Sequence, residues 1–544
     1  MTASEAGPPA LGDSPAEQRD VRRSARRWWA LVAIAASVLV VGLDLTVLNL
    51  ALPTMSVSLH ASTSDLQWIT DSYSLVLAAL ILPAGLLGDR YGRKRLLLIS
   101  LVLFGASSAA CAYATSVGEL IAARAVLGIG AAAIFPLALS VLPVLFAPEE
   151  RQKAVAAIAG ATMLSFPIGP IVGGYLLSHF WWGSVFLINV PVVVIAFAAV
   201  AMLMPESRSE RRPSIDLSGL AVSTIGLVAL TYGFIKAGQD GWSDATAVVL
   251  IAVGVIVLAL LPLVERRIAS RGGQPLADLQ LFRSRGFRWG TILATLVSFS
   301  MFGIFFALPQ YFQEVRGADA LGSGIRLLPL IGGMLVGMVV GTRLTAARKG
   351  GEAPTGPRTV VTAGYLLMAA AMVLGALTTL ASSTGYVLGW VALAGLGLGL
   401  VMPSAMGVAL GALSAERSGA GSALLTAMRQ VGSTIGVAVL GTVISNSYSS
   451  GVAGSAAGLP AQAAAAVRSS VGAGVAVASK LGSSSLLDTI RSSFVHGMDL
   501  MLWTCGGIAI ASALLAVLFL PRRTRTQDAG DVTSDSVPGS LPVG

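Results

Sequence analysis

Charged residues are scarce in this sequence: Asp, Glu, Lys and Arg together make up 12% of its 544 residues, whereas 55% of the residues are hydrophobic. A water-soluble fold of this length could not bury so much apolar surface. The composition therefore excludes an ordinary soluble protein. It predicts an all-α integral membrane protein, for which lipid is the solvent along much of the chain.

Cysteine and histidine are scarcer still. The chain has only Cys111 and Cys505, and its three histidines, His60, His179 and His496, lie far apart. Such spacings provide neither a disulfide framework nor a metal site, so we expect no metal. No Lys follows a Gly, which excludes a P-loop of the Gly-Lys-Ser/Thr type and ATP as the energy source by that route. We expect no cofactor, which leaves an ion gradient as the energy source.

Long apolar runs recur along the chain, each with the roughly 18 to 25 residues that a helix needs to cross about 30 Å of hydrocarbon. The runs predict fourteen membrane spans. These are Trp29–Leu52, Trp68–Leu87, Leu96–Tyr113, Leu120–Leu142, Ala154–Leu177, Val185–Met204, Leu217–Ile235, Ala245–Val264, Gly290–Phe312, Ile325–Thr342, Val360–Leu380, Val387–Leu410, Ala420–Ile444 and Leu500–Leu520.

The positive charges follow the predicted membrane. A net charge of +9 would suggest a nucleic-acid partner for a soluble protein, but here Lys and Arg concentrate in alternate connections and in both tails. Of the 36 Lys and Arg residues, only five fall in the connections on the opposite side: Lys236, Arg316, Arg468, Lys480 and Arg491. Cytoplasmic loops carry the excess of positive charge. We therefore expect a multi-pass protein of a cytoplasmic membrane, with both termini cytoplasmic and no nucleic-acid partner. The excess of Arg over Lys, 31 to 5, and the Ala- and Gly-rich composition indicate a bacterial membrane.

The spans fall into groups of six, two and six, which suggests two repeated halves with an inserted helix pair. Two polar tails should be disordered. A long outer loop in the second half should contain short surface helices. In residue numbers, the tails are 1–27 and 521–544, the halves are 28–204 and 289–520, the central pair with its cytoplasmic linkers is 205–288, and the outer loop is 445–497.

Asp44 lies deep in the first span, in the run Leu43-Asp-Leu-Thr-Val-Leu-Asn-Leu-Ala-Leu-Pro53. A carboxylate at this depth is costly unless it faces a wet cavity or becomes protonated, so it is a candidate for proton or substrate coupling. The alternative is a polar packing residue whose carboxylate is satisfied by Thr46 or Asn49.

Two other charges fall in spans. Asp71 lies about one turn inside the outer face of the second span, and because spans one and two are antiparallel, Asp44 and Asp71 could line one cavity. A second acid would suit dicationic substrates. Arg124 stands in the fourth span. For both Asp71 and Arg124 the alternative is a side chain that snorkels to water near the outer face.

Two further motifs combine glycine with charge or proline. The loop after span two runs from Gly85 to Arg95 as Gly-Leu-Leu-Gly-Asp-Arg-Tyr-Gly-Arg-Lys-Arg. Span five contains the run from Ser165 to Gly174, Ser-Phe-Pro-Ile-Gly-Pro-Ile-Val-Gly-Gly. There Pro170 removes a backbone donor and the glycines thin the helix, which predicts a bend and close packing against a neighbouring helix.

These motifs, together with the run around Asp44, resemble the fourteen-span drug:proton antiporter family of the major facilitator superfamily, over nearly all the spans. The resemblance implies the major facilitator fold and coupling roles for Asp44, Asp71 and Arg124. Positive-inside anchoring would explain the basic residues of the loop motif, but neither its aspartate nor its glycines. The implied gating residues are Gly85, Asp89, Arg90, Gly92, Arg93 and Lys94, and the implied antiporter signature is Gly169, Pro170, Gly173 and Gly174.

The substrate cavity is less well defined by the sequence. Tyr311 and Gln313 lie at a helix end, where aromatic residues are more often interfacial anchors. Arg429 lies in span thirteen and needs a partner, and we expect it in a hydrogen-bond network within the protein rather than in contact with substrate. The possible cavity residues are Thr46, Asn49, Tyr73, Tyr311 and Gln313.

The predicted function is proton-coupled efflux of drugs or other lipophilic, often cationic, small molecules by alternating access between the halves. The partners would be a small-molecule substrate, the proton and the lipid bilayer, and we expect a monomer. A dedicated exporter of one metabolite or self-made antibiotic is the alternative. Proton symport into the cell is a further possibility, against which the span-five motif argues. A membrane-bound enzyme or sensor is disfavoured, because the sequence offers neither a soluble domain nor a nucleophile–base pair.

Overall fold

The computed structural model of the chain describes residues 15–146, 148–206, 217–270, 279–345, 355–413 and 418–521. Within these residues the chain is helical and forms no strand. Eleven helical segments of this part of the chain are long and apolar enough to cross a membrane. The predicted all-α membrane fold is therefore confirmed.

The helices follow the predicted spans in order. The first half contains α1 (Pro15–Ser58), α2 (Thr63–Tyr91), α3 (Arg93–Ala112), α4 (Val117–Ser140), α5 (Leu142–Leu145), α6 (Pro148–His179), α7 (Ser184–Leu187) and α8 (Asn189–Leu203). The central pair is α9 (Leu217–Asp240) and α10 (Ala245–Ser270). The second half contains the 3-10 helix η1 (Leu279–Arg283), α11 (Arg285–Gln310), the π-helix η2 (Tyr311–Val315), α12 (Ala320–Thr345), α13 (Pro357–Ala376), α14 (Thr384–Gly411), α15 (Ser418–Ala456), α16 (Ala461–Ser469), α17 (Val471–Leu481) and α18 (Ser484–Phe519). Each of the fourteen predicted spans overlaps a long helix, although the sixth is divided into α7 and α8 and the ninth runs from α11 into η2.

Buried apolar side chains form two separate clusters. One cluster is built almost entirely from α1 to α8, and the other from the helices that follow the central pair. Each half therefore has a core of its own, as a bundle that moves against its neighbour requires. The halves meet along two seams, where α2 packs against α15 and α6 packs against α12.

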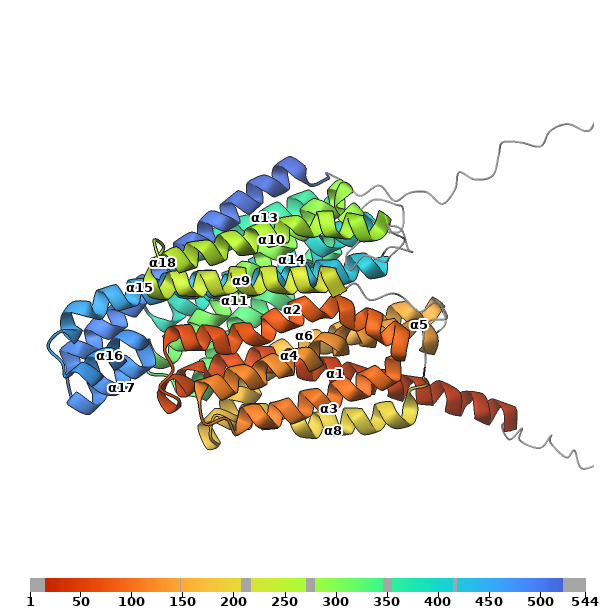
Figure 1. Cartoon of the computed structure of the whole chain (residues 1–544), viewed down its shortest axis with the longest axis horizontal. Coiled ribbons are helices and arrows are strands. Elements are labelled where there is room, and N and C mark those ends of the chain that lie inside the picture. The colour runs from red at the N-terminus through yellow and green to blue at the C-terminus, as the bar shows by residue number, and fades with distance from the viewer. Residues whose placement is uncertain are drawn as a thin grey trace, which may run out of the picture.

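The central pair lies against the first of these seams. Helix α9 packs on both α2 and α15 (Figure 1). The rings of Trp68 in α2 and Tyr232 in α9 lie 5.7 Å apart. On the other side, the hydroxyl of Thr442 in α15 donates to the carbonyl of Phe234 in α9 at 3.4 Å. The inserted hairpin thus touches both halves.

Helices α16 and α17 gather at one end of the bundle, beyond the ends of most other helices (Figure 1). Two short helices therefore lie in the segment where short surface helices were expected, and their place on the outer side of the membrane stays a prediction. The loop itself is shorter than predicted, because α15 continues to Ala456 and α18 already begins at Ser484. Both helices extend past the apolar runs from which their spans were predicted.

The chain ends differ from the sequence prediction in one respect. Helix α1 begins at Pro15, so the part of the expected disordered tail from residue 15 onward is helical. The side chain of Arg27 in this extension forms a 3.0 Å ion pair with Glu150 at the start of α6. Residues 1–14 and 522–544, and the linker residues 207–216, lie outside the described residues.

Candidate functional site

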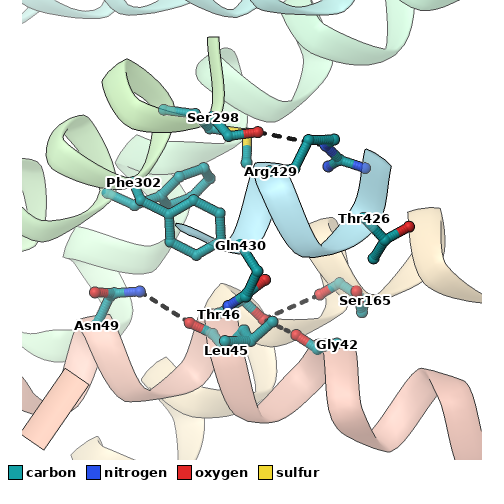
Figure 2. A pocket seen from close by; sticks show the side chains of 12 residues that line it. Gly42, Leu45, Thr46, Asn49, Ser165, Ser298, Phe302, Thr426, Arg429 and Gln430 are labelled. Carbon is teal, nitrogen blue, oxygen red and sulfur yellow. Dashed lines mark hydrogen bonds between the residues drawn. The ribbon is translucent and has the colours of Figure 1, made fainter. Parts of the chain in front are cut away.

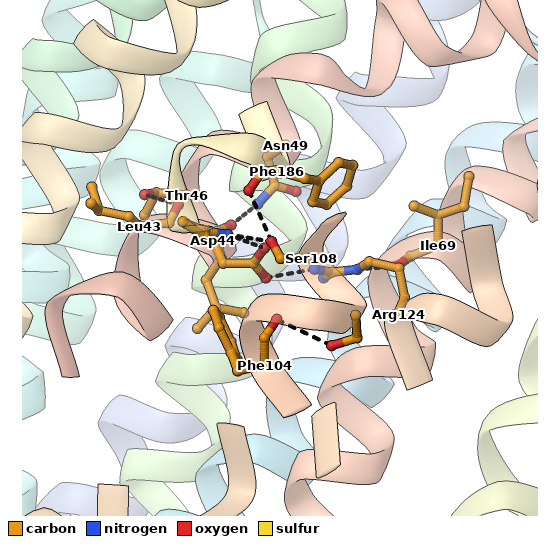
Figure 3. A network of polar contacts seen from close by, with 12 residues as sticks. Leu43, Asp44, Thr46, Asn49, Ile69, Phe104, Ser108, Arg124 and Phe186 are labelled. Carbon is orange, nitrogen blue, oxygen red and sulfur yellow. Dashed lines mark hydrogen bonds and ion pairs between the residues drawn. The ribbon is translucent and has the colours of Figure 1, made fainter. Parts of the chain in front are cut away.

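Asp44 and Arg124 form an ion pair inside the first half (Figure 3). Asp44 comes from α1 and Arg124 from α4, and Nη1 of Arg124 donates to Oδ2 of Asp44 at 2.5 Å. Their side chains are 1% and 0% exposed. Nδ2 of Asn189, at the start of α8, donates to Oδ1 at 3.3 Å. One opposite charge and one amide therefore compensate the Asp44 carboxylate.

Neighbouring groups fix the position of Arg124. Its Nε donates to the carbonyl of Ile69 in α2 at 3.1 Å, and its guanidinium carbon lies 4.4 Å from the centroid of the Tyr73 ring. Asn189 is fixed in turn, since it also donates to the hydroxyl of Ser108 at 3.0 Å. The interpretation of Arg124 as a snorkelling side chain is wrong, because the guanidinium is fully buried and is held by groups from α1 and α2.

Thr46 and Asn49 do not satisfy Asp44. The hydroxyl of Thr46 donates to backbone carbonyls, including that of Ser165 in α6 at 3.3 Å, and Nδ2 of Asn49 donates to the carbonyl of Leu45 at 2.8 Å. The alternative in which these two residues neutralise Asp44 by local packing is therefore wrong. They lie instead on the opposite face of α1, toward the second half.

A cavity lies between the halves, with α1 and α6 on one side and α11 and α15 on the other (Figure 2). Its volume of about 130 Å³ is below the roughly 300–1,000 Å³ of a typical small-molecule site, so it must widen to take up a drug-sized ligand. The lining residues are Gly42, Leu45, Thr46, Asn49, Ser165, Ser298, Met301, Phe302, Phe305, Thr426, Arg429 and Gln430.

Only two of the predicted cavity residues, Thr46 and Asn49, line this cavity. Tyr73 packs against the buried ion pair. Tyr311 is buried in the second half, and Nε2 of Gln313 donates to the carbonyl of Leu50 in α1 at 2.9 Å. Gln313 therefore joins the halves instead of facing the cavity. Neither predicted acid lines the cavity either, so the structure does not place Asp44 and Asp71 on one cavity.

Asp71 lies on α2 with a fully buried side chain, and among the described residues neither of its carboxylate oxygens has a hydrogen-bond partner. One turn earlier, Nε2 of Gln67 donates to the carbonyl of Ala438 in α15 at 3.1 Å. Residues four apart share a helix face, so Asp71 lies on the side of α2 that packs against α15. The snorkelling interpretation is wrong for Asp71, because the side chain does not reach solvent. Its role in coupling stays a prediction.

The loop motif forms the junction between α2 and α3. Gly92 has a φ of 111°, which favours glycine, and a Cβ there would lie 2.8 Å from Oε1 of Glu206. Glu206 follows α8 and accepts hydrogen bonds from the backbone N–H groups of Lys94 and Arg95, each at 3.1 Å. Its carboxylate therefore caps the N-terminus of α3. Gly85, earlier in the motif, packs against α4.

Lys94 of the motif contacts its own half. Nζ of Lys94 donates to the carbonyl of Ala201 in α8 at 2.7 Å. Arg90 and Arg93 are half-buried. The side chain of Asp89 lies outside the described residues, so its pairing with the second half stays a prediction.

The glycines of the span-five motif bring α6 against α1. A Cβ on Gly169 would overlap the side chain of Thr46, and one on Gly173 would lie 2.7 Å from Cγ1 of Val47. The wall of the cavity formed by α1 and α6 is therefore packed without room for a methyl group at either glycine.

The same motif brings α6 against the second half. A Cβ on Gly174 would lie 2.8 Å from Cα of Leu321 in α12. A Cβ on Gly324 of α12 would overlap the carbonyl of Pro170. The backbones of α6 and α12 are in contact here, so the predicted close packing is confirmed and lies at a seam between the halves.

Hydrogen bonds join the halves at the end of the bundle that carries α16 and α17. The hydroxyls of Ser56 in α1 and Ser470 lie 2.7 Å apart, and the hydroxyl of Thr63 in α2 donates to the carbonyl of Ser469 at 3.1 Å. The bonds of Gln67 and Gln313 described above also join the halves. The segment of α16 and α17 thus fastens the second half to the ends of α1 and α2.

Several residues of these sites were not predicted. Arg429 makes the predicted internal hydrogen bond, from Nε to the hydroxyl of Ser298 at 3.3 Å, but it also lines the cavity beside Gln430. Asn189 could have been suspected as a polar residue at the start of an apolar run. Asp499, one residue before the predicted last span, lies inside α18 with Oδ1 buried and unpartnered among the described residues.

Comparison with known sequences places these features in a family. The profile of the Major Facilitator Superfamily matches residues 34–437. The tetracenomycin C resistance and export protein of Streptomyces glaucescens is 35% identical over 504 residues, which cover 90% of this chain and 91% of the relative. The methyl viologen resistance protein SmvA of Salmonella typhimurium is 32% identical over 90% of this chain and 97% of its own length. The multidrug efflux pump LfrA of Mycolicibacterium smegmatis is 34% identical over 88% of this chain and 93% of its own length.

Solved structures share the fold. A bacterial homologue of the human lysosomal transporter Spinster, in an inward-facing and unoccupied conformation, superposes with a TM-score of 0.62 at 16% identity, covering 95% of this chain and 100% of that chain. The human organic anion transporter MFSD10 superposes with a TM-score of 0.54 at 15% identity, and the match covers 90% of this chain and 99% of that chain. At these identities the likeness concerns the fold alone.

Proposed function

Because this chain belongs to the major facilitator superfamily and is a multi-pass membrane transporter, not an enzyme, we propose that it exports lipophilic small molecules, drugs or antibiotics, in exchange for protons. The observation that carries the proposal is the buried pair of Asp44 and Arg124, which lies on the helix that also forms one wall of the cavity. Relatives named for drug resistance and export support the direction of transport.

The coupling follows from the two faces of α1. Asp44 holds one face of this helix to α4 and α8, while Thr46 and Asn49 on the other face line the cavity. Protonation of Asp44 removes its negative charge, so the attraction to Arg124 is lost and α1 is free to shift against α4. Any such shift moves the cavity wall, because α6 is in close contact with α1 at Gly169 and Gly173 and must move with it.

The conformation described here corresponds to one stage of this cycle. The bonds at Ser56, Thr63, Gln67 and Gln313 fasten the halves at the α16–α17 end, so that end is closed. The substrate would enter from the opposite end, where α1 begins and α18 ends. With both termini in the cytoplasm of a bacterial cell, as proposed, the closed α16–α17 end is the outer end, and the proton would enter from outside when this end opens. A monomer suffices for the cycle, since both seams lie within one chain.

A dedicated exporter of one antibiotic is the second candidate. It is favoured by relatives named for a single compound, such as tetracenomycin C and puromycin. The two candidates differ only in the breadth of the compounds that the cavity accepts.

Everted membrane vesicles that contain the protein test both candidates. A panel of cationic, neutral and anionic drugs is added to vesicles with an imposed proton gradient, and substrate-induced proton release is recorded against vesicles without the protein. Proton release with many compounds supports a multidrug exporter, and release with one compound supports the dedicated exporter. Substrate movement that needs no proton gradient would overturn proton coupling.

A further inference from the structure

The cavity wall carries a positive charge, whereas a site for organic cations would be expected to carry a negative one. Among the described residues that line the cavity, none carries a carboxylate, and one, Arg429, carries a positive charge. The nearest acid discussed above, Asp44, lies on the far face of α1 with its charge compensated by Arg124. Whatever enters the cavity therefore meets a net positive wall.

Arg429 has unused hydrogen-bonding capacity. Its Nε donates to Ser298, another wall residue, at 3.3 Å, and its Nη1 contacts only the thioether sulfur of Met406 at 3.6 Å, which is a weak acceptor. Within the described part of the chain no carboxylate lies within 4.0 Å of this guanidinium. A guanidinium without a carboxylate partner at the edge of a cavity can bind an anionic oxygen of a ligand.

Two side-chain amides complete the polar part of the wall. Oδ1 of Asn49 and Nε2 of Gln430 are buried and lack hydrogen-bond partners among the described residues. Figure 2 shows Gln430 extending from α15 toward Thr46 on α1, across the cavity. Buried polar atoms rarely stay unpaired, so a ligand that carries oxygen or hydroxyl groups would satisfy atoms that this conformation leaves unsatisfied.

Besides the hydroxyl-bearing residues Thr46, Ser165 and Thr426, the rest of the wall is apolar or aromatic. Phe302 and Phe305 from α11, with Met301 beside them, offer ring and thioether surface to a flat aromatic ligand. Ring faces also attract cations. Here the ring quadrupoles compete with the full positive charge of Arg429 in the same small space, and a full charge acts more strongly on a ligand cation than a quadrupole does.

We propose that this cavity selects flat aromatic substrates that are neutral or carry an acidic oxygen, and that it discriminates against organic cations. This inference rests on the proposed function, because it assigns the cavity as the substrate site. It replaces the sequence-based prediction of often cationic substrates, which depended on Asp44 and Asp71 facing the substrate.

Binding to the full-length protein in lipid nanodiscs tests the selection without any transport step. Three probes share one ring system and differ in charge: 1-pyrenecarboxylate, 1-pyrenemethanol and 1-pyrenemethylammonium. Equilibrium dialysis against empty nanodiscs corrects for partition into lipid. We expect the carboxylate to bind about tenfold or more tightly than the ammonium, the size of one charge-assisted hydrogen bond. Equal or tighter binding of the ammonium probe to the wild-type protein would overturn the proposal, and this comparison needs no variant.

Variants then identify the source of the selection. Arg429→Gln should weaken carboxylate binding about tenfold and leave the neutral probe little changed, whereas Arg429→Lys should keep the preference. Arg326→Gln is the matched control, because it removes an arginine from α12 that does not line the cavity. If Arg429→Gln is folded, as judged by size-exclusion chromatography, and keeps the full preference for the carboxylate, the proposal is wrong.

Transport of the same probes separates this inference from the proposed function. If everted vesicles accumulate the ammonium probe but not the carboxylate under a proton gradient, efflux stands and the substrate class is wrong. If the carboxylate binds selectively but no gradient moves it, the cavity selects as proposed and the proton-driven function is wrong.

Discussion

Arg124 holds Asp44 by a 2.5 Å hydrogen bond in a region where neither side chain is more than 1% exposed. The two residues are 80 positions apart in the chain and come from α1 and α4. A buried pair of this kind is weak evidence for stability, because desolvation offsets much of the attraction, but separation of the pair is costly. The pair is thus suited to hold one conformation until a proton removes one of its charges.

Asp44→Asn should abolish proton-driven efflux and lower stability by about 3–5 kcal/mol, because Arg124 stays charged and buried without its partner. Substrate-induced proton flux in everted vesicles and thermal unfolding in detergent measure the two effects. The double variant with Arg124→Gln should recover part of the lost stability and none of the coupling. Full proton-coupled efflux by Asp44→Asn would exclude this carboxylate from the coupling.

Asp71→Asn, unlike Asp44→Asn, should not lower the stability of the protein. The carboxyl oxygens of Asp71 have no hydrogen-bond partner among the described residues, so the substitution removes an acid whose charged form is costly to bury and breaks no hydrogen bond of the described residues. We expect a melting temperature no lower than that of the wild type, measured side by side with Asp44→Asn. A loss of several degrees would show that Asp71 has a partner that stabilises the fold. The proton-flux assay on the same preparation decides whether Asp71 takes part in coupling.

Gly174→Ala should impair the protein, whereas Gly160→Ala should not. The added methyl group at position 174 would lie 2.8 Å from the backbone of Leu321, and overpacking of this kind costs about 1–3 kcal/mol. A Cβ at Gly160 of the same helix meets nothing within 4 Å, and alanine there gains up to about 1 kcal/mol of helix propensity. Efflux rate and melting temperature of both variants provide the comparison. Equal behaviour of the two would contradict the close contact of α6 with α12.

A cross-link between Ser56→Cys and Ser470→Cys should stop transport reversibly. The two hydroxyls lie 2.7 Å apart, so the substituted thiols can be oxidised to a disulfide that keeps the α16–α17 end closed. The experiment uses a background in which Cys111 and Cys505 are replaced by Ser. We expect efflux to fall on oxidation and to return with dithiothreitol, whereas Ser56→Cys alone is unaffected by the oxidant. Undiminished efflux by the cross-linked protein would show that this end need not open.

Much of the fold could be predicted from hydropathy, because the membrane sets the length of a span and an apolar run of that length predicts one. The ends of helices are harder to predict. Helices α15 and α18 continue beyond their apolar runs through Ser- and Ala-rich turns, where propensity and packing, not hydropathy, maintain the helix. The last predicted span therefore begins at Leu500, whereas α18 also contains Asp499 and the residues back to Ser484.

Some residues of the site could be predicted from the sequence and others could not. Asp44 and Arg124 could be found because charges inside spans are rare and costly, but the sequence does not tell which charge meets which. The predicted internal hydrogen bond of Arg429 is confirmed. Its position on the cavity wall could not be predicted, because that position depends on how α15 is rotated about its axis. Glu206 gave little signal, because an acid near a linker is ordinary, and only the fold brings it to the N-terminus of α3.

The position of α9 gives the bundle two unequal sides. A lipid-dissolved molecule that approaches the seam of α2 and α15 meets α9 first, which holds Trp68 on one helix and Thr442 on the other. The seam of α6 and α12 has no corresponding inserted helix among those described, and its glycine-rich backbones meet directly. In this chain the inserted hairpin covers the α2–α15 seam, whereas none of the described helices covers the α6–α12 seam, so the two sides of the bundle present different surfaces to the lipid.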